Sequence, residues 1–352
     1  LRLWLQADDL ALTNGAGVSV WRDQSGQGHD LSQGVTNGRP TYEAGALNGR
    51  AAVHFDGTND GLVGALGSLP APLTMVVVSR FDQLHQGSND YDYVAKIGQD
   101  VTNSCASINR FCLNPPQGSQ YSDHYYALQG ANGYVTGPEL LGQTWTILTA
   151  EHGTNAPRHG LWMDGVEQTV GSYAQSVGTD GSIELGRYSK LTVTNHYLKG
   201  SIAEVLVYEK TLSQAEREEI EHYLDVKYAV NFAPKVEAGA DQGILSGATA
   251  TLDGTVTDDG LPAVPGMVTT LWTKVAGPGD VTFGNAAQVD TTAQFSQTGR
   301  YRLKLTAWDG EKSASDEMEV AVQLAASTNV PQSGLRLWLQ ADDLALTNGA
   351  GV

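Results

Sequence analysis

The chain has 352 residues, of which 41% are hydrophobic and 41 are glycine, which is enough for two or three domains with sizeable cores. Its 39 acidic and 21 basic side chains give a formal net charge of −18. A surface of this charge repels nucleic-acid phosphates and anionic lipid, so neither is an expected partner. The sequence also contains no apolar run long enough to span a membrane.

Short strands separated by turns rich in Gly, Asn and Asp are predicted throughout residues 1–232. In the opening LRLWLQ, Leu1, Leu3 and Leu5 alternate on one face. The continuously apolar LTMVVVSRF is typical of a strand that is covered on both faces. Further strands are predicted at 51–57, 144–152, 160–168, 183–188 and 200–210, the one at 160–168 bent by a turn at Asp164-Gly165.

One helix is predicted near the end of this region, within TLSQAEREEIEHYLDVKYAV. Ser213 is followed three residues later by Glu216, which is the spacing of a capping box. Four larger side chains fall on one face at helical spacing: Ile220, Tyr223, Leu224 and Tyr228.

Pro234 and a change of rhythm mark a boundary, after which residues 233–324 again read as strands. Their intervals of roughly 10 to 20 residues are typical of a small sandwich. Trp272 lies in the alternating segment TTLWTKV and is an expected core residue. Residues 325–334, small and polar with one proline, are predicted to be a linker.

Residues 335–352 repeat residues 1–18 without a difference. A single strand leaves its backbone groups unpaired, so the second copy needs a sheet to complete. We expect it to be the first strand of a following repeat, joined covalently through the linker. The alternative is insertion into a separate chain by strand exchange, which requires an empty place in the partner. That place should already hold Leu1 to Leu5, so covalent continuation is favoured.

Three motifs in residues 1–232 give a resemblance to bacterial concanavalin A-like (laminin G, pentraxin-type) jelly-roll domains. They are the D-x-S-G-x-G-x-D core of WRDQSGQGHDLSQ, the segment AAVHFDGTNDGL, and a terminal strand followed by an L-S-x-A-E helix ending in Y-L-x-x-K-Y. Residues 233–324 resemble PKD-like immunoglobulin-fold modules through APKVEAGADQ, ATLDGTVTDDGLP, LWTKVAGPGDVTF and YRLKLTAWDGEKSASDEMEV.

The resemblance implies an all-β chain: a concanavalin A-like jelly-roll sandwich with one short C-terminal helix, followed by an Ig-like (PKD-type) β-sandwich. Both families are mostly extracellular and occur in long multidomain chains. Neither implies an activity by itself.

Catalytic motifs are absent from the sequence. It has no E-x-D-x-E strand of the kind that jelly-roll glycosidases share, no zinc-binding H-E-x-x-H, no G-x-S-x-G and no P-loop. We therefore expect no enzymatic activity.

Two loops carry the oxygen ligands that Ca²⁺ takes. DQSGQGHD offers Asp23, Ser25 and Asp30, and FDGTND offers Asp56, Asn59 and Asp60. The sequence predicts that the two loops adjoin and share a calcium site. The alternative is that both are turns whose Asp and Asn side chains accept hydrogen bonds from their own backbone.

Cys105 and Cys112 are the only cysteines, and their spacing predicts a small disulfide loop, with two free thiols as the alternative. Tyr121, Tyr125 and Tyr126 in YSDHYYALQG are candidates for a ligand site or an interface, or for local packing, in a segment expected to be a loop.

The sequence leaves two candidate functions open. The first is a non-enzymatic structural repeat unit of an extracellular, cell-surface filament or giant adhesin, arranged as beads on a string and contacting neighbouring repeats. The second is a lectin-like carbohydrate-binding module of a secreted adhesin or polysaccharide-degrading enzyme, with glycan partners. An identical repeat favours the first, because an appended lectin needs only one or two copies.

Overall fold

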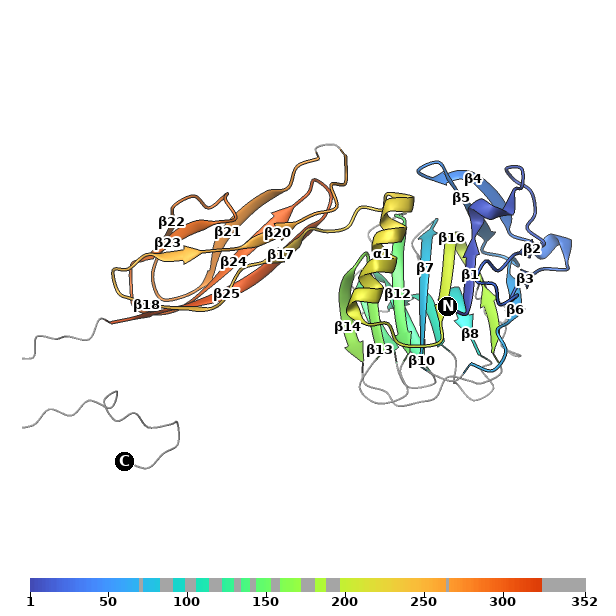
Figure 1. The fold of residues 1–352 in the computed structure, drawn as a ribbon, viewed down its shortest axis with the longest axis horizontal. Coiled ribbons are helices and arrows are strands. Elements are labelled where there is room, and N and C mark those ends of the chain that lie inside the picture. Colours follow the sequence, from blue (N-terminus) through green and yellow to red (C-terminus); the bar gives the residue numbers. More distant parts are fainter. Residues whose placement is uncertain are drawn as a thin grey trace, which may run out of the picture. The chain divides into compact units, whose positions relative to one another are not determined.

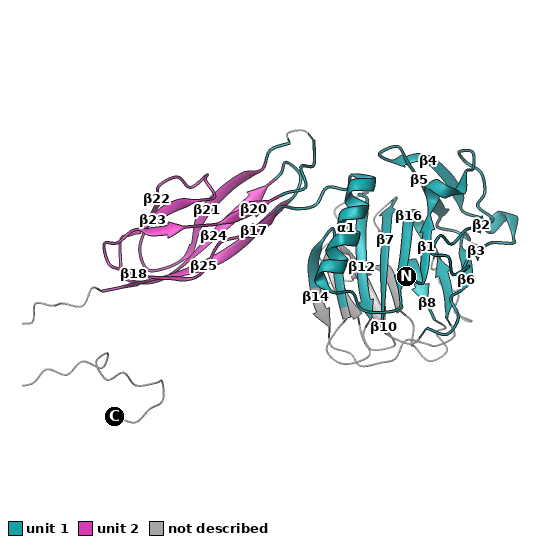
Figure 2. Cartoon of the chain, viewed as in Figure 1, with its two compact units in different colours: residues 1–234, 258–267, 309–312 teal, residues 235–257, 268–308, 313–352 magenta. Residues whose placement is uncertain are grey.

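The computed structural model describes residues 1–69, 72–82, 91–98, 106–113, 122–129, 134–139, 144–152, 159–171, 181–187, 197–263 and 266–324. Two compact units divide the chain (Figure 2). Unit 1 comprises Leu1–Pro234, Asp258–Met267 and Asp309–Lys312, and unit 2 comprises Lys235–Thr257, Val268–Trp308 and Ser313–Val352. Unit 1 thus includes two short segments beyond the expected boundary. No described helix is long and apolar enough to cross a membrane.

Unit 1 is built around two sheets (Figure 1). The first, here called sheet A, has the strand order β14 (Val166–Gly171), β13 (His159–Met163), β12 (Thr146–His152), β7 (Leu73–Phe81), β16 (Lys199–Tyr208), β5 (Arg50–Asp56) and β4 (Thr41–Leu47), with β1 (Leu3–Gln6) also paired to β16. Sheet B has the order β11 (Tyr134–Glu139), β10 (Ser122–Gln129), β9 (Ala106–Leu113), β8 (Tyr91–Ile97), β15 (Ser182–Leu185), β6 (Leu62–Ala65), β3 (Leu31–Ser32) and β2 (Val20–Trp21).

Alternate side chains of each strand explain how one sheet can have two buried faces. Leu73, Met75 and Val77 of β7 belong to the main core cluster, together with side chains of sheet B. Val76 and Val78, which point to the opposite face, pack in a second cluster with the helix. The continuous apolar character of β7 is therefore accounted for, because sheet A is covered on both faces.

The helix α1 (Gln214–Tyr228) forms where the sequence predicts it. Ser213 accepts the backbone N–H of Glu216, and the Glu216 side chain accepts the backbone N–H of Ser213, which completes the capping box. Leu224 and Tyr228 are fully buried in the second cluster, whereas Tyr223 is 38% exposed. The predicted apolar face is therefore only partly buried.

The segment predicted as one bent strand at 160–168 is instead the hairpin β13–β14. Asp164 and Gly165 both have positive φ, 48° and 77°, which is the backbone of a tight two-residue hairpin turn. An Asp-Gly pair accepts this conformation readily, so the chain reverses fully at this point.

Unit 2 is a smaller all-β sandwich. Its four-stranded sheet has the order β18 (Gln242–Leu245), β25 (Ser313–Gln323), β24 (Gly299–Trp308) and β21 (Thr269–Ala276). The other strands are β19 (Ala250–Leu252), β23 (Thr291–Phe295) and β22 (Val281–Phe283) in one sheet, and β17 (Lys235–Glu237) with β20 (Thr255–Thr257). Trp272 is buried, as predicted, and donates its indole N–H to the Val289 carbonyl at 2.9 Å.

Candidate functional site

The strand β1 occupies a place on sheet A that is defined on several sides. It runs antiparallel to β16, with Leu3 opposite Val207 and Leu5 opposite Val205. The side chains of Leu3 and Leu5 are fully buried in the main core. The opening segment is therefore confirmed as a strand of the first sandwich, with Leu3 and Leu5 on its buried face.

The other face of β1 meets a buried carboxylate. Glu204 of β16 is fully buried, and its Oε1 accepts the indole N–H of Trp4 at 2.6 Å and the hydroxyl of Tyr223 at 3.1 Å. Its Oε2 accepts the Lys227 ammonium at 2.6 Å and the Tyr228 hydroxyl at 2.7 Å. Every lone pair needed to hold a buried charge is thus engaged.

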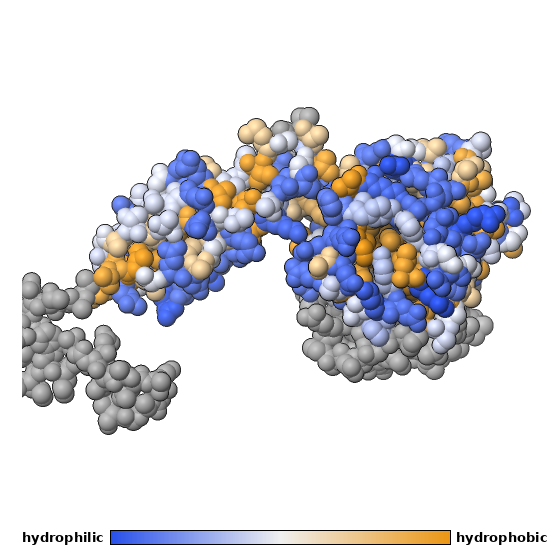
Figure 3. All heavy atoms as spheres, viewed as in Figure 1, coloured by the Kyte–Doolittle hydropathy of each residue, from blue (hydrophilic) through white to orange (hydrophobic). Residues whose placement is uncertain are grey.

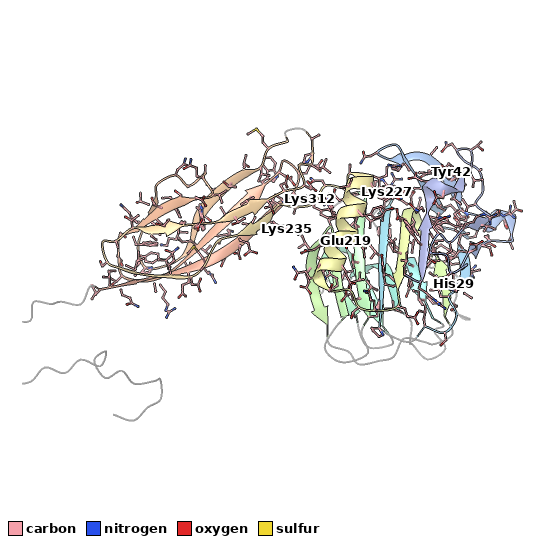
Figure 4. The ribbon with its side chains drawn as sticks, viewed as in Figure 1. His29, Tyr42, Glu219, Lys227, Lys235 and Lys312 are labelled. Carbon is pink, nitrogen blue, oxygen red and sulfur yellow. The ribbon has the colours of Figure 1, made fainter. Side chains whose placement is uncertain are left out.

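We call Glu204 and its four donors, Trp4, Tyr223, Lys227 and Tyr228, the Glu204 network. Lys227, which Figure 4 labels on α1, also donates to Gln6, so the side chains of Trp4 and Gln6 both join this cluster. Burial, and then the negative charge of Glu204, raise the pKa of Tyr223 and of Tyr228 well above the ordinary value. Both hydroxyls therefore stay protonated and act as donors to the carboxylate.

The free edge of β1 is covered by the loop 23–30. Asp23 accepts the Trp4 backbone N–H at 3.0 Å, and Gln24 donates its own backbone N–H to the Trp4 carbonyl at 2.7 Å. The Ser25 hydroxyl is 3.3 Å from the Arg2 carbonyl. Both backbone groups of Trp4 on this edge are consequently satisfied.

Asp23 is the centre of this loop. Its two oxygens also accept the backbone N–H of Ser25 at 2.8 Å, the Ser25 hydroxyl at 2.8 Å and the backbone N–H of His29 at 2.9 Å. Burial acts to raise the pKa of Asp23, but these hydrogen bonds outweigh it, and the pKa lies below its ordinary value.

The rest of the segment 1–18 also makes specific contacts. The segment continues through the 3₁₀ helix η1 (Ala7–Leu10), where Asp8 accepts the Ala51 backbone N–H at 2.8 Å. Asn14 accepts the Ala44 backbone N–H at 2.8 Å, and Val18 donates to the Pro40 carbonyl at 2.7 Å. Residues 1–18 are therefore held in unit 1 by contacts along their length, beyond the single strand that the sequence predicts.

The residues predicted to bind calcium lie in turns that use their own oxygens. Asp30 accepts the Asp23 backbone N–H at 2.9 Å, and Asp60 accepts that of Asp56 at 3.0 Å. Asp56 in turn accepts the backbone N–H groups of Thr58 and Asn59, at 2.7 and 3.3 Å. Among the described residues, no group of three His, Cys, Asp or Glu is arranged to hold a metal ion.

The expectation that the two loops adjoin is wrong. Strands β3 and β6 pair antiparallel with Ser32 opposite Val63, so Asp30 lies level with Ala65. Asp60 precedes Ala65 by five residues, so Asp60 lies about 17 Å along the strand from the level of Asp30. The loops stand at opposite ends of one strand pair and cannot share an ion. Calcium as a ligand of this chain stays a prediction, but not at the shared site that the sequence indicates.

The cysteine and tyrosine predictions fall largely outside the described residues. Cys105 and Tyr121 are among the residues that the structure does not describe, and side chains are not described for Cys112, Tyr125 and Tyr126. Their strands nevertheless bear on the predictions. Tyr125 and Tyr126 belong to the strand β10, which corrects the expected loop.

The disulfide between Cys105 and Cys112 stays a prediction, because Cys105 lies outside the described residues.

A cluster of Ser, His and acidic side chains lies on sheet A but does not form a catalytic relay. Ser201 donates to Glu43 at 2.9 Å and lies 3.2 Å from Nδ1 of His54. The same Nδ1 is 3.6 Å from Asp82. In a triad, the two ring nitrogens face the hydroxyl and the acid separately. Here one nitrogen faces both, and Ser201 is fully buried.

Beside the Glu204 network is an apolar groove of about 480 Å³ between α1 and the outer face of sheet A. It is lined by Leu1, Trp4, Leu206, Tyr208, Lys210, Leu212, Glu216, Glu219, Ile220 and Tyr223. Figure 3 shows hydrophobic atoms gathered on this face next to the helix. The groove thus begins where the chain enters β1.

Sequence reasoning missed Glu204 and Lys227, although one signal was available. Glu204 is the only charged residue between Lys199 and Glu209 in the apolar strand segment GSIAEVLVY. A lone acidic side chain inside such a strand requires buried partners. The candidate partners were the polar residues of the helix that follows in the chain.

The Glu204 network yields a stability prediction. Substitution Glu204→Ala removes the acceptor of four donors and leaves the Lys227 ammonium, 9% exposed, without its counter-charge. We expect it to lower the free energy of unfolding by about 3–5 kcal/mol in denaturant titrations. Glu219→Ala, on the exposed part of α1, is the matched control. A loss below about 1 kcal/mol for Glu204→Ala would contradict this view of the site.

The Asp23 loop yields a pH-dependent prediction. Because the folded pKa of Asp23 lies below the unfolded value of 3.8, the ionised group stabilises the fold above that pH. The stabilisation is lost as the pH falls through the lower, folded pKa. Asp23→Ala should cost about 2–3 kcal/mol at pH 7. It should also accelerate amide hydrogen exchange at Trp4, whereas Asp30→Ala should affect Trp4 much less.

A protein-family model matches the second unit of the chain. The model describes a PKD domain, and it covers residues 238–322. Among solved structures, domain 4 of AbnA, an extracellular arabinanase from Geobacillus stearothermophilus solved with arabinotriose, is 17% identical, with a TM-score of 0.42 over 63% of this chain and 98% of that domain.

Two further solved structures are similar to parts of the chain. The heptameric SAP-like pentraxin of Limulus polyphemus is 13% identical, with a TM-score of 0.36 over 46% of this chain and 77% of that one. The PKD domain from the KIAA 1837 protein is 26% identical, with a TM-score of 0.23 over 27% and 91%. The chain is thus an all-β protein in which a jelly-roll sandwich precedes an Ig-like sandwich that matches a PKD domain model.

Proposed function

We propose that this chain is a structural repeat unit of an extracellular, cell-surface tandem-repeat protein, and that successive units are joined covalently. The observation that carries the proposal is the identity of residues 335–352 with residues 1–18. In the structure, the first copy supplies β1 to sheet A and hydrogen-bonds to Glu204 and to the start of β5, which supports the proposal.

The second copy has every group that the first copy uses. Leu337 and Leu339 correspond to the core residues Leu3 and Leu5. Trp338 and Gln340 correspond to Trp4 and Gln6, which reach the Glu204 network. Asp342 corresponds to Asp8, which binds the start of β5. Residues 335–352 are therefore chemically competent to begin another jelly roll.

Occupancy favours covalent continuation over strand exchange. In this chain, the place of β1 on β16 is already filled, and Asp23, Gln24 and Glu204 hold it there. An exchanging strand must first break those contacts. A following jelly roll that lacks its own first strand has no such competitor, so residues 335–352 can complete it directly.

The remaining features fit a passive unit. The proposed role requires no catalysis, and the main partners are neighbouring repeats of the same polypeptide. The charge of −18 favours solubility at high local concentration.

Calcium is proposed as an accessory ligand only. Millimolar Ca²⁺ should then raise the melting temperature of the chain relative to a chelator, and an unchanged melting temperature would contradict the proposal.

A matched pair of substitutions tests the repeat-unit proposal. In the 352-residue chain, Leu3→Asp should unfold unit 1, because it places a charge in the main core. Leu337→Asp should leave the melting temperature unchanged. In a two-copy chain, made of residues 1–334 followed directly by a second run of residues 1–334, Leu337→Asp should unfold the second jelly roll alone.

The contrary result is equally clear. If Leu337→Asp has no effect in the two-copy chain, residues 335–352 do not serve as a first strand and the proposal fails.

The second candidate function, a lectin-like module, makes a different demand. It requires saturable binding of a defined glycan by the 352-residue chain, measurable on a glycan array and by calorimetry.

A further inference from the structure

The apolar groove beside α1 has no cover among the described residues, although its floor is hydrophobic. Leu206, Leu212 and Ile220 line it, and Tyr223 at its edge is 38% exposed. Two of its charged residues already engage each other, because Lys210 pairs with Glu216, which also caps the helix. An occupant of this groove should therefore be uncharged and partly apolar.

The first residue of the chain shows which segment reaches the groove. Leu3 pairs with Val207, and the Arg2 backbone N–H donates to the Val207 carbonyl. Leu1, the next residue outward, itself lines the groove. A polypeptide that leads into β1 therefore starts from the edge of this groove.

The sequence itself says what leads into a copy of β1. Residues 325–334, AASTNVPQSG, precede Leu335 and carry no charged side chain. If Leu335 to Gln340 take the place of β1, Leu335 lies where Leu1 lies, at the edge of the groove. Val330 and Pro331, the larger apolar residues of the segment, precede it closely in the chain.

The two residues before β1 show which way the chain enters it. The Arg2 side chain donates to the Leu66 carbonyl at 2.9 Å, away from the groove, whereas Leu1 lines the groove. The following Pro331 favours extended backbone at Val330. Val330 therefore reaches about 17 Å from Leu335, the copy of Leu1.

We propose that the groove of each jelly roll is the docking site of the linker that enters it, with Val330 and Pro331 as the occupants. This inference rests on the repeat-unit proposal and deepens it. The last residues of the linker are then bound to the unit that follows and are not a free tether.

The test uses the two-copy chain with the photoreactive residue p-benzoylphenylalanine in place of Val330. Irradiation should attach position 330 to peptides between Leu212 and Tyr223 of the second copy, as read by mass spectrometry. Ile220→Asp in the second copy should lower the yield about tenfold by charging the floor of the groove. Val226→Asp is the matched control, because Val226 is on the same helix and 69% exposed, and it should leave the yield unchanged.

Hydrogen exchange in residues 335–340 of the same samples separates the two proposals. Slow exchange with a cross-link in the second groove supports the docking site. Slow exchange with cross-links elsewhere, or with equal yields in the Ile220→Asp and Val226→Asp variants, overturns the docking site and leaves the repeat unit intact. Fast exchange in residues 335–340 overturns the repeat unit and the docking site together.

Discussion

The pairing of β1 with β16 is the constraint on which the rest of unit 1 depends. β16 lies inside sheet A, and each of its edges must be paired because its backbone is buried. β5 covers one part of an edge, and β1 covers the part that β5 leaves free. Four of the first six residues thus complete a strand that is 200 positions away in the sequence. The folding of unit 1 cannot finish without them.

The Glu204 network makes this pairing specific. An apolar strand of similar size could fill the core positions of Leu3 and Leu5, but it could not offer an indole N–H to Glu204 and an amide oxygen to Lys227. A buried charge that loses one donor costs more than the contact contributes, so an incorrect strand is penalised. The network therefore selects the right segment, and the eighteen identical residues include all of its β1 partners.

Elements with strong local signals were predictable from the sequence. The capping box fixed the start of α1, and period-two or continuous apolar patterns located β1 and β7. The turn at Asp164-Gly165 was found, but its sharpness was underestimated, so one bent strand was expected where a hairpin forms. The prediction of one calcium site shared by two loops was wrong. The sequence analysis took Asp23 and Asp60 as joint ligands because their loops are near in the sequence, whereas the β3–β6 register separates them. The Glu204 network joins β16 and α1, which are consecutive in the chain, to β1, which lies 200 positions earlier, and no local pattern predicts this last contact.

The loop 23–30 has one more consequence, which concerns chains with many identical parts. Units of the same sequence, held at high local concentration, are prone to pair through their exposed strand edges and to aggregate. The outer edge of β1 would be the natural place for such a mistake, because every copy has the same edge. Asp23 and Gln24 occupy the backbone groups of Trp4 on that side, so a neighbour finds no hydrogen-bonding partner there. In the proposed repeat protein, the same short loop that secures the first strand would also keep each unit from pairing with the wrong neighbour.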